Sequence, residues 1–426
     1  MQAKLFRYLF ENARAGLIQT GSIWDNRNDQ HTDYMYVAGA NIGKPILKPL
    51  STTLRLEHDV SMPLNLFVLG AYTIPSIKKM VEAIEIRSVR TIVLPYVTPM
   101  ERLMLAYACH TDVDKHIKVG IFLENPYLFL KKMGVENIYF VYGNDKNVHF
   151  SPENYNEGME ERSYKVCFEL QSSEIRQYVN ELEGYEIPLY KAGHIIENGW
   201  LFYFGCYGRG LQATRKFADQ YFGKQESELE EKVKSAMPEF YAQFKTIADA
   251  VITMYVGPMY RVEEAGKARM MGKIFSKDMG CSPYICQKAT SCDIKCMYEE
   301  DHCVFRRHNN EAGLPPIMGM LLLGNVNLKA EIAEITHRYY SIRRGIRCIS
   351  VPNCGNAFNW NQQLPLLWTG EFIHQWMCPM TSFSSPEMLK DIIISNTNNE
   401  IVGISEENGY CLSGIIATFA EEDHIG

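Results

Sequence analysis

A cluster of cysteines is the feature of this sequence that points most directly to chemistry. Five of the 12 cysteines fall within 23 residues, and His302 lies beside the last of them: Cys281, Cys286, Cys292, Cys296 and Cys303. Thiolates bind Zn²⁺ as a tetrahedral set of four, and one such ion can stabilise a polar loop that lacks a core. The spacings include no C-x2-C pair, so they differ from those of a zinc ribbon. One structural zinc ion is therefore one interpretation; free thiols on a surface loop and a redox role are the others.

Two further polar segments have residue types that could bind ligands. Gly205–Gly210 (GCYGRG) follows an expected strand and could offer backbone amides to a phosphate. It has neither the G-x-G-x-x-G spacing nor a Gly-Lys-Ser/Thr end, so a simple turn is favoured. The second segment has alternating metal-ligand types, although its polarity favours a solvated connection: Cys109, His110, Asp112, Asp114 and His116.

A basic segment offers a nucleic-acid interface as an alternative. Its arginines are interleaved with tyrosines, a combination that suits contact with a nucleic-acid backbone. A solvated helix end or a protein interface would explain the same composition. The residues concerned are Arg338, Arg343, Arg344 and Arg347, with Tyr339 and Tyr340 between them.

Composition limits the class of protein. The chain has 426 residues, of which 46% are hydrophobic and 22% charged, and its net charge is -7. These values exclude a disordered chain or a coiled-coil rod, and the negative charge argues against whole-surface affinity for nucleic acid or anionic lipid. The N-terminal residues lack the apolar stretch of a signal peptide, and the apolar run Ile317–Leu323 is far short of the ~20 residues of a membrane helix. We expect a cytoplasmic protein with no membrane partner and with reduced or metal-bound thiols.

Strands alternate with short helices in the first 205 residues, which predicts an α/β fold. Leu64–Leu69 is nearly all apolar, as a buried parallel strand is, and Ile74–Ile86 has helical periodicity. The same reasoning predicts further strands and helices at 34–37, 91–94, 99–109, 125–133, 137–142 and 200–204.

The pattern changes at Gly205. A helical pattern runs from Leu211 to Met254, and the cysteine-rich segment Lys277–Gly313 shows little periodicity. Strand-like sequence returns at 318–323, 348–351 and 400–404. We therefore divide the chain into an N-terminal half-domain (1–205), a helical and Cys-rich insertion (206–313) and a C-terminal half-domain (314–426).

Several short sequence segments, taken in chain order, resemble motifs of the metallo-β-lactamase fold superfamily. The closest is Ile92–Leu103 (IVLPYVTPMERL), which resembles the family's ILPYLTPEERLLLA. In the C-terminal half, Leu321–Asn325 resembles LLTGD and Val351–Asn356 resembles VPHHGS. The sequence resembles in particular the metallo-hydrolase-like proteins found beside STAND-type NTPases and proteases in bacterial defence loci. The resemblance covers about 1–205 and 315–426, and it implies an αββα sandwich of two mixed sheets with helices outside.

The sequence departs from the family at the positions that carry its chemistry. Members hold two divalent ions with histidines and aspartates, so that a bridging hydroxide can attack the substrate. Glycine, isoleucine and proline have no ligating side chain, and asparagine is a weak neutral ligand. The resemblance therefore implies a vestigial site without a metal cofactor, formed by Gly70, Tyr72, Ile74, Pro75, Asn325, Asn353 and Cys354.

Three functional hypotheses follow. The leading one is a catalytically inactive binding or regulatory component of an antiphage defence complex, with a STAND-type NTPase or a protease as its partner. The second is an active metal-dependent hydrolase or nuclease with a relocated site, using Cys354, His374 or the cysteine loop. The third is a nucleic-acid-binding module. The replaced ligands weigh against an enzyme.

Overall fold

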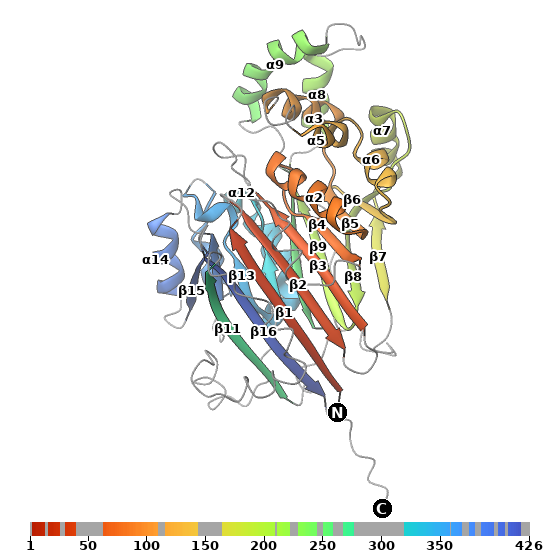
Figure 1. Ribbon diagram of the computed structural model, residues 1–426. Helices are drawn as coiled ribbons and strands as arrows, with labels where there is room; N and C mark the ends of the chain where they lie inside the picture. Colours follow the sequence, from red (N-terminus) through yellow and green to blue (C-terminus); the bar gives the residue numbers. More distant parts are fainter. Residues whose placement is uncertain are drawn as a thin grey trace, which may run out of the picture.

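A continuous mixed sheet of 16 strands forms the frame of the protein in its computed structural model (Figure 1). The structure describes residues 2–12, 16–25, 30–39, 63–109, 116–143, 164–208, 211–221, 229–244, 250–258, 267–276, 319–357, 359–368, 375–379, 385–395, 399–404 and 408–418.

The first part of the sheet combines an antiparallel and a parallel block. Its strands are β1 (Gln2–Asn12), β2 (Leu17–Asp25), β3 (Gln30–Ala38), β4 (Leu64–Leu69), β5 (Val89–Pro95), β6 (Asn137–Val141), β11 (Lys267–Ser276) and β16 (Asn408–Thr418). The order is β11-β16-β1-β2-β3-β4-β5-β6, antiparallel as far as β3 and parallel from β3 to β6. The apolar sequence of β4 suits a strand that is covered on both faces.

The second part continues from β6 without a break. Its strands are β8 (Leu189–Glu197), β9 (Trp200–Tyr207), β10 (Val251–Pro258), β12 (Gly319–Leu322), β13 (Ile346–Ser350), β14 (Gln375–Pro379) and β15 (Glu400–Ile404). The pairs from β8 to β12 are antiparallel and those from β12 to β15 are parallel. Strand β7 (Lys165–Leu170) pairs with β8 beside this path.

The sheet curls around an inner apolar core. Tyr34 from β3 packs edge-on against Phe202 from β9, with ring centroids 5.0 Å apart. Trp200 Nε1 donates to Tyr8 Oη at 2.7 Å and so joins the two parts across the core. The predicted αββα sandwich of two sheets is therefore wrong. The structure has one mixed sheet that is nearly closed into a barrel, because β6 and β8 hydrogen-bond the two parts into one.

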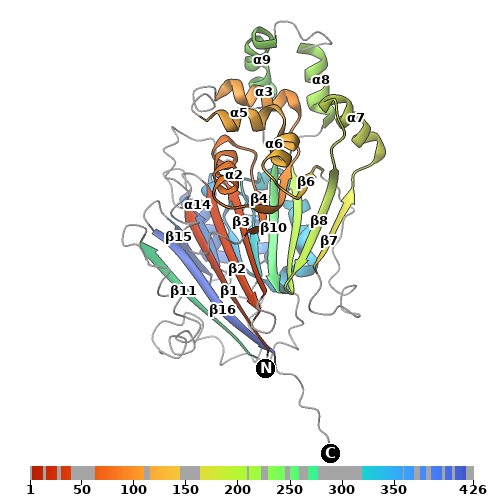
Figure 2. The ribbon, with the colours of Figure 1, turned by 45° about the vertical axis from the view of Figure 1, so that its right-hand side comes forward.

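Helices pack outside the sheet and beyond one of its ends (Figures 1 and 2). The α-helices are α2 (Ile74–Ile86), α3 (Pro99–Ala108), α5 (Ile117–Glu124), α6 (Pro126–Lys132), α7 (Ser173–Glu183), α8 (Leu211–Tyr221), α9 (Leu229–Phe244), α12 (Leu328–Tyr339), α13 (Gln363–Trp368) and α14 (Pro386–Ser395). Two 3₁₀ turns follow α12 and β13: η2 (Tyr340–Gly345) and η3 (Pro352–Gly355). Helix α2 begins after Thr73, whose side chain accepts from the Ser76 amide, as an N-cap does.

Part of the predicted insertion belongs to the sheet. The helical pattern expected over Leu211–Met254 contains α8 and α9, but its last residues begin β10, which lies between β9 and β12. Residues 277–313 lie outside the described residues, and the three-part division stays a prediction. In the part of the chain that the structure describes, no helix is long and apolar enough to cross a membrane.

Candidate functional site

The carboxyl ends of four strands meet at one end of the curled sheet. Strands β3 and β4 lead into Gly39 and Gly70, and β12 and β13 lead toward Asn325 and Asn353. The Gly70 carbonyl accepts from Ile252 N at 3.0 Å, so this end also contacts β10. In sheets with parallel strands, ligands bind at the carboxyl ends of the strands. We therefore treat this meeting point, the strand-end junction, as the candidate site.

Neutral side chains hydrogen-bond the backbone of Gly39 at the junction. Asn325 Nδ2 donates to the Gly39 carbonyl at 2.7 Å, and Thr73 Oγ1 donates to the same oxygen at 2.9 Å. The Gly39 amide in turn donates to Ser76 Oγ at 2.7 Å. Both polar groups of Gly39 are therefore bonded to side chains from two other segments.

Asn353 hydrogen-bonds the loop after β12 at the junction. Its side-chain amide donates to the Asn325 carbonyl at 2.8 Å and to the Val326 carbonyl at 3.2 Å, and its backbone amide donates to the Gly324 carbonyl at 3.2 Å. Its φ is 48°, in the left-handed region that asparagine tolerates better than most residues. This backbone conformation turns the side chain back onto the loop after β12.

Tyr36 occupies the space under the junction. A Cβ on Gly70 would lie 2.3 Å from the Tyr36 ring, and a Cβ on Gly324 would lie 2.5 Å from Tyr36 Oη. The hydroxyl donates to the Ile252 carbonyl at 2.7 Å, and burial raises the pKa of Tyr36 far above its ordinary value. Any larger residue at position 70 or 324 would have to displace this ring.

The structure brings only some of the expected site residues together. Gly70, Asn325 and Asn353 meet at the junction, and Pro75 lies beside Gly39. Tyr72 instead packs into the outer core of the helices, with its ring centroid 6.0 Å from that of Phe122, and Ile74 belongs to the same core. The backbone of Cys354 lies in η3, directly after Asn353.

Sequence reasoning missed a buried ionic cluster next to Tyr72. Arg102 on α3 pairs with Glu183 at the end of α7 at 2.8 Å, and their side chains are 4% and 2% exposed. Tyr185 Oη lies 3.1 Å from Glu183 Oε2, and desolvation raises the pKa of Tyr96 well above its ordinary value. A pattern in the sequence could have signalled the cluster, because Tyr72 and Tyr96 each follow the end of a parallel strand closely.

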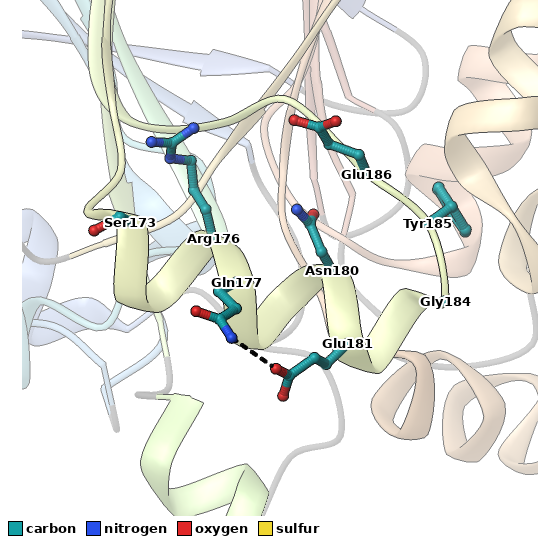
Figure 3. Close-up of a pocket in the computed structure, with 8 residues that line it drawn as sticks. All are labelled: Ser173, Arg176, Gln177, Asn180, Glu181, Gly184, Tyr185 and Glu186. Carbon is teal, nitrogen blue, oxygen red and sulfur yellow. Dashed lines mark hydrogen bonds between the residues drawn. The ribbon is translucent and has the colours of Figure 1, made fainter.

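The phenol groups of Tyr72 and Tyr96 are buried beside this ion pair, and the pKa of each is raised by desolvation in the first place. Figure 3 shows an open surface hollow at α7. Its lining residues are Ser173, Arg176, Gln177, Asn180, Glu181, Gly184, Tyr185 and Glu186. Gln177 Nε2 donates to Glu181 Oε1 at 3.1 Å across its rim. Tyr185 belongs both to the hollow and to the cluster.

The basic segment is only partly available at the surface. Arg338 is buried, its Nε donates to Tyr207 Oη at 3.2 Å, and its guanidinium lies 5.7 Å from that ring centroid. Arg343 stacks over the Tyr340 ring at 3.6 Å, and desolvation lowers the pKa of Arg347 to about 10. Arg338 therefore cannot take part in a surface contact in this conformation, and nucleic-acid binding stays a prediction for the neighbouring arginines, Arg344 among them.

The zinc prediction falls outside the described residues, as do His374 and all five cysteines of the cluster: Cys281, Cys286, Cys292, Cys296 and Cys303. Among the described residues, no three His, Cys, Asp or Glu side chains lie close enough together to hold a metal ion. The described contacts of the junction involve amide, hydroxyl and backbone groups. These groups donate and accept hydrogen bonds, but none titrates near neutral pH.

Comparison with family models, with curated proteins and with solved structures found no match to the chain.

Proposed function

We propose that this protein is a non-catalytic binding component in which the strand-end junction holds the sheet in shape instead of turning over a substrate. The observation that carries the proposal is the pair of bonds from Asn325 and Thr73 to the Gly39 carbonyl. The Asn325 bond joins the two parts of the sheet, and the Thr73 bond joins the loops after β3 and β4, at the place where a ligand would be expected. Because the groups involved are neutral, they supply no general acid or base at physiological pH.

The partner class rests on the sequence resemblance described above. We propose a bacterial defence complex, with a STAND-type NTPase or a protease as the partner. A rigid scaffold whose strand ends are joined by hydrogen bonds suits a protein that binds its partner through its surface.

A hydrolysis assay tests the non-catalytic part. The full chain would be incubated with Zn²⁺ or Mn²⁺ and with phosphodiester and β-lactam reporters, beside the Asn325→Ala and Asn353→Ala variants. We expect no turnover above the metal-only control for any of the three proteins. Metal-dependent turnover by the wild type that either variant abolishes would overturn the proposal.

Affinity purification of the tagged chain from its native host tests the partner class. We expect a stoichiometric NTPase or protease to remain bound through a salt wash. If the chain comes down alone, or with proteins of neither class, the partner part of the proposal is wrong, while the hydrolysis assay still decides the non-catalytic part.

A further inference from the structure

Strand β7 lies at an edge of the sheet. It pairs with β8 and with no other strand in the part of the chain that the structure describes, and both ribbon views place it at the outer margin (Figures 1 and 2). Its alternate residues Lys165, Cys167 and Glu169 are exposed. An edge strand presents backbone N–H and C=O groups that can pair with another chain.

The inward face of β7 is fixed by aromatic packing. The Phe168 ring stacks on Tyr139, with centroids 4.1 Å apart, and it covers Gly193, where a Cβ would lie 2.2 Å from the ring. Val166 packs on the same inner core. The strand is therefore held in one position and register, as a template for pairing requires.

We propose that two copies of this chain pair through β7, antiparallel, about a two-fold axis at Cys167. In this register Lys165 lies opposite the partner's Glu169, and Glu169 lies opposite the partner's Lys165. On the inward face, Val166 lies opposite the partner's Phe168. The inference is independent of the proposed function, because it uses none of the residues of the strand-end junction.

Charge complementarity selects this register. Opposite charges directly across two antiparallel strands stabilise the pair, whereas like charges destabilise it. A shift of one residue would turn the inward face of one copy outward, and a shift of two residues would separate both charge pairs. The pairing also covers Tyr164 and Leu170, which are 41% and 50% exposed at the ends of the strand.

Charge reversal tests the proposal. Sedimentation velocity of the full chain over a concentration series should show a reversible dimer. Lys165→Glu or Glu169→Lys alone should weaken it at least ten-fold, because each places like charges opposite one another twice. The double variant Lys165→Glu/Glu169→Lys should restore the dimer.

Restoration of the dimer by the double variant distinguishes an effect on the interface from an effect within one chain. Within one chain, Lys191 Nζ lies 2.9 Å from Glu169 Oε1. Glu169→Lys and the double variant both lose this ion pair, but only the double variant should dimerise. Lys118→Glu, at the exposed pair of Lys118 with Glu85, is the matched control and should leave the dimer unchanged. Circular dichroism confirms that each variant is folded.

Oxidative cross-linking tests the position of the axis. Directly opposed residues of antiparallel strands have Cα atoms roughly 4.5–5.5 Å apart, within the range that a disulfide spans. Mild oxidation should therefore give a covalent dimer that Cys167→Ser abolishes and Cys109→Ser retains. A monomer at every concentration, a dimer indifferent to the charge reversals, or cross-linking that survives Cys167→Ser would each overturn the proposal.

Discussion

His194 links the stability of the protein to pH. It is 7% exposed on β8, and desolvation, with a smaller effect from Lys165, lowers its pKa to about 4. The unfolded chain binds a proton near pH 6.5, whereas the folded chain does not bind it until about pH 4. Stability from this residue is therefore complete above pH 6.5 and is lost as the pH falls through that window.

We predict that His194→Gln reduces this loss. At pH 5 the wild type should have lost about 2 kcal/mol of unfolding free energy through this residue relative to pH 7.5. Urea unfolding at both pH values measures the difference, with His337→Gln on the exposed side of α12 as the control for removing an imidazole. Equal pH dependence in the wild type and His194→Gln would contradict the prediction.

Asn353 gives a prediction about the strand-end junction. Asn353→Ala loses the bonds to the Asn325 and Val326 carbonyls and also forces alanine to adopt a φ near 48°, so it should cost about 2–3 kcal/mol. Asn353→Gly loses the same bonds but tolerates the backbone, so it should cost about 1–2 kcal/mol. Chemical denaturation measures both, and a glycine variant less stable than the alanine variant would show that the backbone conformation is unimportant.

At the scale of elements, the Arg102–Glu183 pair ties α3 to α7. Removal of one partner leaves a buried charge, so Glu183→Gln or Arg102→Met should each cost about 3–5 kcal/mol. The double variant should cost clearly less than the sum, because neither charge is then stranded. A thermodynamic cycle from urea unfolding measures the coupling.

The exposed pair of Lys118 with Glu85 provides the comparison. Lys118→Met removes a similar contact at the surface, where solvent screens the charges, and should cost less than about 1 kcal/mol. If Lys118→Met cost as much unfolding free energy as Glu183→Gln, burial would not be the reason for the effect.

Elements with a single strong signal were predictable from the sequence. The strand Leu64–Leu69, the helix Ile74–Ile86 and the strand Glu400–Ile404 are confirmed with their expected bounds. Strands β1, β2 and β16 were missed, because their polar and apolar residues mix within the run and their partners lie far away in sequence. The sequence predicts a helix as far as Met254, but β10 begins at Val251, since a short apolar run fits either structure.

The proximity of three replaced ligand positions could be predicted from the sequence, but their contacts could not, and their role as a site stays a prediction. The replaced ligand positions directed attention to Gly70, Asn325 and Asn353, which do meet. Nothing local in the sequence indicates that Asn325 would donate to a carbonyl 286 residues away. The resemblance predicts Tyr72 beside them, but its side chain belongs to the core under the helices, because tertiary packing sets its orientation.

At the scale of the whole molecule, one continuous sheet predicts cooperative unfolding. Both parts of the sheet contribute to the inner core, and Trp200 bonds to Tyr8 across it. Far-UV circular dichroism and tryptophan fluorescence should therefore give coincident urea transitions. Tyr8→Phe should lower the unfolding free energy by about 1 kcal/mol and move both transitions equally.

Two separated transitions would contradict this prediction. They would show that parts of the sheet unfold separately. Double-jump refolding could then identify which block forms first.

The pairing of β1 with β16 has a consequence for folding during translation. Gln2 of β1 pairs with Thr418 of β16. Strand β1 can therefore pair with β16 only after some four hundred further residues have been synthesised. At ordinary translation speeds this wait is on the order of half a minute. During that time the outer edge of β1 has no native partner. We therefore expect the nascent chain to depend on chaperones that shield this edge until β16 arrives.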